Sequence, residues 1–511
     1  MEQYNDMNAW GGFVQLPVCD KTVTTEISGE FTLPDYQPEI KRLLKVSASV
    51  LPASKYIGER EAEFAGGIDY YVLYTGSDNN VYCAPLSSEY KVSVPVENEN
   101  QAGLSNMCAY ASVSPDMISG RVTSPRKLNI KCRLRTRALI YGDMAIEDSY
   151  DAEGGELQKL EGEAEASRAL MSNGDVLRLS DEMIYDSKEG DVRVISAEAK
   201  PLISETAVSP NAVNCRGELY LKLLLCRDDE SVPYTVVRKL PFSQKVNSEG
   251  VESGASSFIK GSVSEMSINV EENRIITDCA LILECTSYKP ENISFIKDVY
   301  STERECECEY NYPVLMREGV AFGGNFTLSD SMTLEEAGIS SPVNVIDASG
   351  SVHPEENVFD GDRCASLGKV KLSLLVERDG EFSIEDIEFP YRYESNVYTN
   401  GRSEALYDGE VISARARVDG ERIGVDAEIC MRGMAWACEE EKMLDSVSLG
   451  DNISRSRGEI VICYPSKDDS IWGVAKRYAK PANELAAANK LKGSVSYDNK
   501  ESLEGVKYLI V

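Results

Sequence analysis

The sequence predicts a mainly β fold, with three tandem, sandwich-like β modules followed by a small domain of order β-α-α-β. The first observation behind this prediction is the alternation of apolar and polar residues, which is the period of a strand with one face on a core. The second is an internal repeat: one sequence motif, here called a phrase, begins at Gly66, Gly217 and Gly368, so that both intervals are 151 residues. The third is a change to helical periodicity near the C-terminus. We infer that one module occurs three times, with a different domain appended.

The clearest copy of the repeated phrase begins at Gly217. Leucine occupies every second position from Leu219 to Leu225, with Glu218, Tyr220 and Lys222 between. The polar stretch 227–229 predicts a turn, and Val232 to Leu240 predicts the second strand of a β-hairpin. The phrases at Gly66 and Gly368 have the same alternation and a polar turn at the corresponding place.

Two further phrases frame each hairpin. An opening phrase begins at Phe31, Leu177 and Phe326, and a closing strand begins at Lys127, Arg274 and Arg422. In the first opening phrase we expect a short helix from Pro38 to Leu44, because proline is favoured in the first turn of a helix. The third copy has a helical tendency from Thr333 to Ala337.

The closing strands share one position, which is occupied by Cys132, Cys279 and Ala427. A position that accepts both cysteine and alanine predicts a small buried packing site, because a free cysteine behaves as a small hydrophobe. The 14 cysteines are scattered through a long chain and are not concentrated in a small secreted scaffold. We therefore expect reduced thiols.

These phrases divide the chain into modules and linkers. At 511 residues the chain is long enough for several cores. The first linker is rich in Glu, Ala and Leu, which predicts a solvated helix around Glu156 to Met171. The modules are assigned to residues 1–142, 174–288 and 321–437, the linkers to 143–173, 289–320 and 438–458, and the last domain to 459–511.

The last domain begins with a short strand, Glu459 to Tyr464, and a turn that ends at Ser470. Asp469 or Ser470 can cap the helix that follows. Apolar residues then recur at helical spacing, and Pro481 begins a second helix that ends at Asn489. Lys507 to Val511 predicts a closing strand.

Charge and hydropathy exclude several classes of partner. Lys and Arg number 53 against 85 Asp and Glu, which gives a formal charge of −32. This charge repels phosphate backbones and anionic lipids, so we expect neither nucleic acid nor a membrane as partner. Met1 to Trp10 lacks the basic region of a signal peptide, and no apolar run reaches the ~18 residues of a membrane span. The expected location is the cytosol, without membrane insertion.

The sequence offers few groups for catalysis or metal binding. His353 is the only histidine, in a loop-like context, so a nucleophile–base pair has one available base. Cys306 and Cys308 lack a second pair of ligands at zinc spacing. The acidic pairs at 228–229 and 468–469 fall in turns, where aspartate is favoured for structural reasons. We therefore predict no catalytic residue, no metal and no cofactor.

The C-terminal stretch resembles a LysM domain. The matching positions are Ser470, Ile471, Trp472, Ala475, Tyr478, Leu485, Ala488, Asn489, Gly505, Leu509 and Ile510. The turn 467–469 and the enlarged loop from Lys492 to Glu504 depart from the family pattern. LysM domains generally bind their ligand at the rim formed by the first turn and the loop after the second helix. The resemblance therefore implies a partner surface made of Lys467, Asp468, Asp469, Ser470, Ile471, Trp472, Asn489, Lys490 and Leu491.

The modules resemble SPOCS domains, on the phrase FTLPDYQPEIKRLLKV of the first copy and an apolar-Pro-apolar end to each hairpin, as at Pro95, Pro241 and Pro390. SPOCS repeats followed by one LysM domain are typical of the SipL-like family of spore coat morphogenetic proteins. The resemblance implies a non-enzymatic protein of the mother-cell cytoplasm, at the forespore surface. There its LysM domain would bind the coat's basement-layer ATPase, and its modules would scaffold or recruit other coat proteins.

Two alternatives remain open. LysM domains elsewhere bind polymers of N-acetylglucosamine, so the chain could instead be a peptidoglycan-binding protein of cortex or wall. That activity needs export and a groove with little charge, and neither the N-terminus nor the turn at Lys467 to Asp469 favours it. Self-association of the modules is the other alternative that the sequence does not decide.

Overall fold

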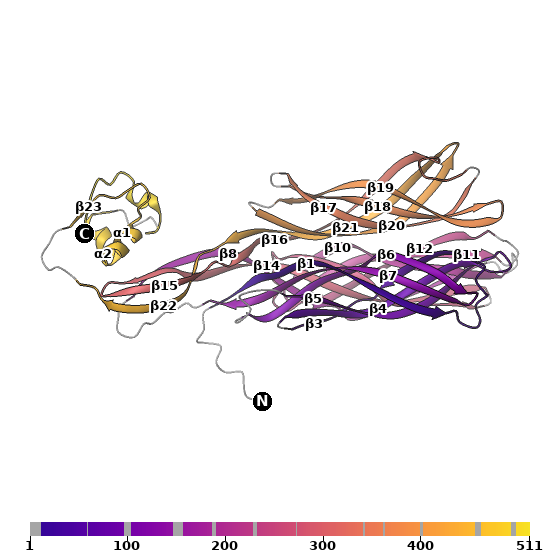
Figure 1. Cartoon of the computed structure of the whole chain (residues 1–511), viewed down its shortest axis with the longest axis horizontal. Coiled ribbons are helices and arrows are strands. Elements are labelled where there is room, and N and C mark those ends of the chain that lie inside the picture. The colour runs from indigo at the N-terminus through magenta and orange to yellow at the C-terminus, as the bar shows by residue number, and fades with distance from the viewer. Residues whose placement is uncertain are drawn as a thin grey trace, which may run out of the picture.

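Long antiparallel strands build most of the computed structural model of this protein (Figure 1). The structure describes residues 12–58, 60–96, 104–146, 157–185, 191–227, 232–271, 273–340, 343–360, 363–398, 402–454, 461–491 and 497–511. The prediction of a mainly β protein is confirmed. Within these described residues, no helix is both long and apolar enough to cross a membrane.

The N-terminal part of the chain forms two sheets. One sheet has the strand order β1-β7-β6. In the other sheet, the central strand β4 pairs with β2, β3 and β5. The strands of the two sheets are β1 (Phe13–Thr32), β2 (Arg42–Val50), β3 (Ser54–Ile57), β4 (Glu61–Thr75), β5 (Val81–Pro95), β6 (Leu104–Ser124) and β7 (Lys127–Ala145).

The same connectivity occurs twice more: one strand leads into a three-stranded meander, and two strands then return to the first sheet. The second set is β9 (Leu177–Ile184), β10 (Val192–Ser209), β11 (Ala212–Arg227), β12 (Tyr234–Asn247), β13 (Ser256–Glu271) and β14 (Arg274–Ser301). The third set is β16 (Val314–Thr333), β17 (Asn344–Asp360), β18 (Arg363–Arg378), β19 (Glu381–Tyr398), β20 (Arg402–Asp419) and β21 (Arg422–Glu440).

The repeated glycines lie in the central strand of each meander, β4, β11 or β18. Each glycine pairs with an aromatic residue of the next strand: Gly66 with Tyr90, Gly217 with Phe242 and Gly368 with Tyr391. A Cβ atom at any of these positions would press on that aromatic side chain. The glycines are therefore required because the aromatic ring on one side and a backbone carbonyl oxygen on the other occupy the space of the missing side chain.

The shared position of the closing strands is buried in all three sheets, at Cys132, Cys279 and Ala427. Burial raises the pKa of both thiols to about 11, so both are protonated at neutral pH. No disulfide links the cysteines of the described residues.

Two helix predictions are wrong, and the helical tendency predicted from Thr333 to Ala337 is confined to a single turn. Residues 38–41 are irregular and Arg42 begins β2, while the segment after Thr333 makes a single turn in which Thr333 and Glu336 cap each other. The segment expected as a helix around Glu156 to Met171 forms β8 (Leu157–Asn173), and Glu156 itself lies outside the described residues. The reason is pairing: β14 offers β8 a full ladder of backbone hydrogen bonds, which outweighs helix propensity.

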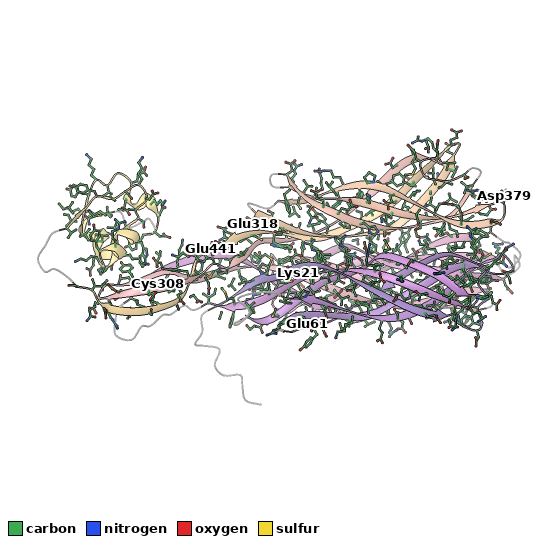
Figure 2. The ribbon with its side chains drawn as sticks, viewed as in Figure 1. Lys21, Glu61, Cys308, Glu318, Asp379 and Glu441 are labelled. Atoms are coloured by element: carbon green, nitrogen blue, oxygen red, sulfur yellow. The ribbon has the colours of Figure 1, made fainter. Side chains whose placement is uncertain are left out.

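The ranges predicted as linkers contain paired strands. The N-terminal half of β8 pairs with the end of β14, and β15 (Arg304–Asn311) pairs with β22 (Met443–Asn452). We call these four strand segments the stalk. Ile296, Val299 and Leu444 are buried between its two layers. Figure 1 shows the stalk projecting from one end of the β body, and Figure 2 places Cys308 on it and Asp379 at the opposite end.

A small unit of mixed structure lies beside the stalk (Figure 1). Its elements are β23 (Ile462–Cys463), α1 (Ile471–Arg477), α2 (Ala482–Ala488), a 3₁₀ helix (Lys500–Leu503) and β24 (Leu509–Ile510). Its own core includes Ile471, Val474, Leu485 and Leu509. We call residues 461–511 the C-terminal unit.

Candidate functional site

The two helices of the C-terminal unit are defined by their ends. The Ser470 side chain caps α1 by accepting a hydrogen bond of 3.1 Å from the backbone N–H of Gly473. Each helix ends in a Schellman motif, with a left-handed residue at Ala479 (φ 51°) and at Lys490 (φ 53°). The turn and the corner that sequence analysis selected as a partner rim are thus fixed by helix capping.

The first turn of α1 faces inward. Ile471 and Trp472 are 1% and 6% exposed. The Trp472 ring meets the Tyr300 ring of β14 edge to face, with centroids 4.8 Å apart, and the indole Nε1–H donates to Asp298 Oδ2 at 2.9 Å. Both residues, selected as partner-binding, therefore contact the stalk or the core of the C-terminal unit in this structure.

Asp298 is the centre of the contact between α1 and the stalk. It lies at a bulge in β14, after Ile296, and its other carboxylate oxygen accepts from Lys476 Nζ at 2.6 Å and from the Tyr310 hydroxyl. Burial alone would raise the pKa of Asp298, but hydrogen bonds from Lys476, Tyr310 and Trp472 outweigh burial and lower it. The carboxylate is therefore ionised and fully paired at neutral pH.

Two further polar contacts hold the C-terminal unit on the stalk. The Tyr300 hydroxyl donates to the carbonyl of Lys480 at 2.7 Å, and Lys297 pairs with Asp498 at 3.1 Å. Leu160 of β8 is also buried in the core of the C-terminal unit. The face of α1 that carries Trp472 is thus covered by this chain itself.

The other predicted rim residues fall into two groups that contact different parts of the C-terminal unit. In the first group, Lys467 and Asp468 are exposed, Asp468 pairs with Lys500, and Asp469 pairs with Arg477. In the second, the Asn489 amide exchanges two hydrogen bonds with the backbone of Ile510 and thereby ties α2 to β24, while Lys490 is exposed and Leu491 half-buried. Residues 492–496 of the enlarged loop lie outside the described residues.

An exposed apolar surface lies on the sheet of the C-terminal unit. Ile462 pairs with Ile510, and their side chains are 50% and 48% exposed, whereas the next pair, Cys463 and Leu509, is buried. Tyr464 and Tyr508 continue the same alternation and are 75% and 55% exposed. We call Ile462, Tyr464, Tyr508 and Ile510 the isoleucine–tyrosine patch.

Sequence analysis missed this patch, although a signal was present. Both terminal strands are apolar at consecutive positions, which is typical of a strand covered on both faces. Only one face of this two-stranded sheet is covered by the helices, so the other displays apolar side chains to solvent.

The residues considered for catalysis lie elsewhere. His353 is within β17, so its expected loop context is wrong, and its Nε2 is 2.8 Å from Ser351 Oγ. Among the described residues no carboxylate hydrogen-bonds the other ring nitrogen of His353, and burial lowers its pKa. Cys306 and Cys308 face β14, where their sulfurs contact backbone groups of Ser301 and Val299. The pair 228–229 lies outside the described residues.

Comparison with protein families gives one match, to the second of the three repeated sets of strands. Residues 192–271 match the family described as SipL, SPOCS domain. The match runs from the first residue of β10 to the last residue of β13. It supports the resemblance to SipL-like proteins and a sporulation-related role connected with the coat. No curated protein matches the chain, and no solved structure does.

We predict that the Asp298 contact weakens in acid. Because the folded pKa of Asp298 is lowered, its contribution to stability is complete above the unfolded pKa of about 3.9 and is lost as pH falls through the folded value. Asp298→Asn is expected to destabilise the C-terminal unit at pH 7 by about 2 kcal/mol. Hydrogen exchange of α1 should show that the stability difference between Asp298→Asn and the wild type stays constant above about pH 4 and narrows as pH falls below it. A difference that does not narrow below about pH 4 would contradict the assignment.

Proposed function

We propose that this chain is a non-enzymatic assembly protein of the spore envelope, with three SPOCS modules as its body and a LysM-type C-terminal unit as its docking element. It works in the mother-cell cytoplasm, at the forespore surface, where the C-terminal unit binds the coat's basement-layer ATPase. The SPOCS match, the connectivity repeated three times and the element order of residues 461–511 support this assignment.

The observation that carries the proposal is the isoleucine–tyrosine patch. Four large side chains, each about half exposed or more, share one face of a small sheet, and apolar residues gathered in this way mark interaction sites. The Trp472 face is occupied by the stalk, so the patch is the apolar surface that the C-terminal unit offers to a partner. Tyrosine and isoleucine there supply contact area, and the tyrosine hydroxyls supply polar contacts at its edge.

Charge indicates the chemistry of the partner. Lys507 adjoins Tyr508 and is exposed, and Lys490 follows Asn489, which is bonded to Ile510. We propose that these two lysines border the patch, on a chain whose overall charge is −32. We propose that the partner is a protein whose docking surface has an apolar centre and an acidic border. The same cations give no reason to prefer an uncharged glycan.

Binding of the purified ATPase to the full-length chain tests the proposal. The double variant Ile462→Glu, Tyr508→Glu places two charges at the centre of the patch and is expected to weaken binding at least ~100-fold. Val237→Glu on β12 is the matched control, because Val237 is exposed to a similar extent (40%) but lies on the body. It should bind like the wild type.

Two parallel measurements separate the alternatives. Retention of the wild-type chain on insoluble peptidoglycan, without affinity for the ATPase, would overturn the proposal in favour of glycan binding. Light scattering of the chain alone shows whether a second copy occupies the patch, which would be seen as a dimer that the double variant abolishes. Equal ATPase binding by the double variant and the wild type would also refute the patch as the docking site.

A further inference from the structure

Equivalent positions of the three repeated sets converge inside the body. Lys45, Ser196 and Asp347 each follow a bulge at the same place, and their strand partners are Leu73, Leu224 and Leu375. All six residues line one internal cavity of about 60 Å³. One cation, one hydroxyl and one anion therefore occupy a single structural position, once in each set.

Polar contacts in this layer cross between the sets. Lys45 Nζ donates to Ser349 Oγ of β17 at 3.0 Å, and Asp347 pairs with Lys222 of β11 at 2.8 Å. Burial lowers the pKa of Lys45. Burial would raise that of Glu198, beside it in the cavity, but Lys200, Lys222 and Lys45 lower it to about 2. The charges of the layer thus neutralise one another across the junction.

A second layer repeats this composition at another equivalent position. Ser112, Lys260 and Asp408 lie opposite Arg137, Glu284 and Arg432 in their sheets, four residues before a bulge that all three sheets share. Lys260 Nζ is 3.3 Å from both Ser112 Oγ and Asp408 Oδ2. Again the three sets contribute one hydroxyl, one cation and one anion, in a different order.

Apolar layers continue the same junction. Tyr110, Phe258 and Leu406 are equivalent residues of β6, β13 and β20, and they are buried in one cluster with Tyr141, Tyr288 and Trp436. The hydroxyls of Tyr141 and Tyr288 are 3.1 Å apart. At the other end of the junction between the sets, a further apolar cluster contains residues of all three meanders, among them Val81, Leu224 and Leu375. The sets therefore surround a common axis, and neighbouring strands touch in a closed cycle, β5 with β10, β12 with β17 and β19 with β2.

The three residues that the sets place in one layer of this axis must differ from one another in charge. Three identical modules would bring three lysines or three aspartates together in a buried layer, and like charges in a low dielectric repel strongly. A layer of Lys, Ser and Asp has no net charge and can satisfy its hydrogen bonds. The three sets therefore differ in sequence at the positions where identical charged residues would repel one another most strongly.

We infer that the three modules form a closed trimer within one chain, in which the axial face of each module is a recognition surface for the other two. The Lys/Ser/Asp layers make the modules non-interchangeable. The body is then one obligate unit instead of three independent binding modules, and the stalk joins strands that flank its second and third modules. This inference does not depend on what the C-terminal unit binds.

The inference is tested by transferring the lysine of the cavity layer from the first module to the second in the full-length chain. Ser196→Lys puts two lysines in the cavity layer, and Lys45→Ser removes the cation, so each variant is expected to lower the midpoint of thermal unfolding by about 5 °C. The double variant restores one Lys, one Ser and one Asp, with the lysine now in the second module, and its side-chain volumes match the original layer. Its midpoint is expected to lie above that of either single variant. A double variant as unstable as the summed effects of the singles would overturn the layer rule.

A separate experiment tests whether the three modules stay together after the chain is cut between the first and the second. A protease site placed between residues 146 and 157 of the full-length chain allows the first module to be cut from the rest. Light scattering of the cut protein at micromolar concentration is expected to show one particle of unchanged mass, and Lys45→Asp is expected to release the first fragment. Lys127→Asp, an exposed charge reversal in the same module, is the matched control and should release nothing. Separation of the wild-type fragments would refute an obligate trimer.

Discussion

Replacing Trp472 by alanine is expected to detach the C-terminal unit from the stalk while leaving the β body folded. The change deletes a buried ring, its contact with Tyr300 and its hydrogen bond to Asp298. Truncation of a buried tryptophan costs about 3–5 kcal/mol, which is a large fraction of the stability of a small unit. Hydrogen exchange should show α1 and α2 losing protection, with the strands of the body unchanged.

Trp472→Phe is the informative control. It keeps an aromatic ring against Tyr300 but lacks the N–H that donates to Asp298, so protection of α1 is expected to fall between the wild type and Trp472→Ala. If Trp472→Ala left α1 fully protected, docking on the stalk through this side chain would be excluded.

Gly217→Ala is expected to be severely destabilising. A Cβ atom at Gly217 collides with the carbonyl oxygen of Leu202 and comes within 2.8 Å of the Phe242 ring. Neither can move away freely, because the oxygen belongs to a paired strand and the ring is buried. We expect a loss of about 3 kcal/mol or more in the free energy of unfolding.

The matched control for this prediction is Gly424→Ala in β21. A Cβ atom at Gly424 meets no heavy atom within 4 Å, so the change is expected to alter stability by less than about 0.5 kcal/mol. Thermal unfolding of both variants decides the matter. Similar stability of the two alanine variants would show that the repeated glycine is not needed for close packing.

The recurring glycine could be found in the sequence because residues of one kind recur at a fixed interval. Glycine recurs at 66, 217 and 368 because the facing aromatic ring and a backbone carbonyl oxygen exclude a side chain, and the position shared by Cys132, Cys279 and Ala427 holds small residues. Both features depend on sterics within one sheet. Local patterns of this kind are what alternation and spacing can reveal.

The axial layers were not predictable by the same route. Lys45, Ser196 and Asp347 occupy equivalent structural positions, but their side chains are chemically unlike. A search of the sequence for recurring residue types therefore does not find them. The stalk was missed for a related reason: β15 and β22 are more than 130 residues apart in the chain, and their composition alone does not reveal a partner. Long-range pairing overrode the helix propensity of β8 in the same way.

For the candidate site, spacing identified α1 and limited its cap to Asp469 or Ser470, of which the structure selects Ser470, but spacing did not show which face of α1 remains free. That depended on Asp298 and Tyr300, which belong to a segment far from the C-terminal unit in sequence. The isoleucine–tyrosine patch becomes visible only when the other face of its sheet is known to be covered by helices.

The most direct test of the central claim is the position of the protein in sporulating cells. Fluorescent fusions of the wild type, of the Val237→Glu control and of the Ile462→Glu, Tyr508→Glu variant should be imaged after engulfment, with immunoblots to confirm equal amounts. The wild type and the control are predicted to surround the forespore, and the double variant to spread through the mother-cell cytoplasm. A double variant that still surrounds the forespore at normal abundance would contradict docking through the patch.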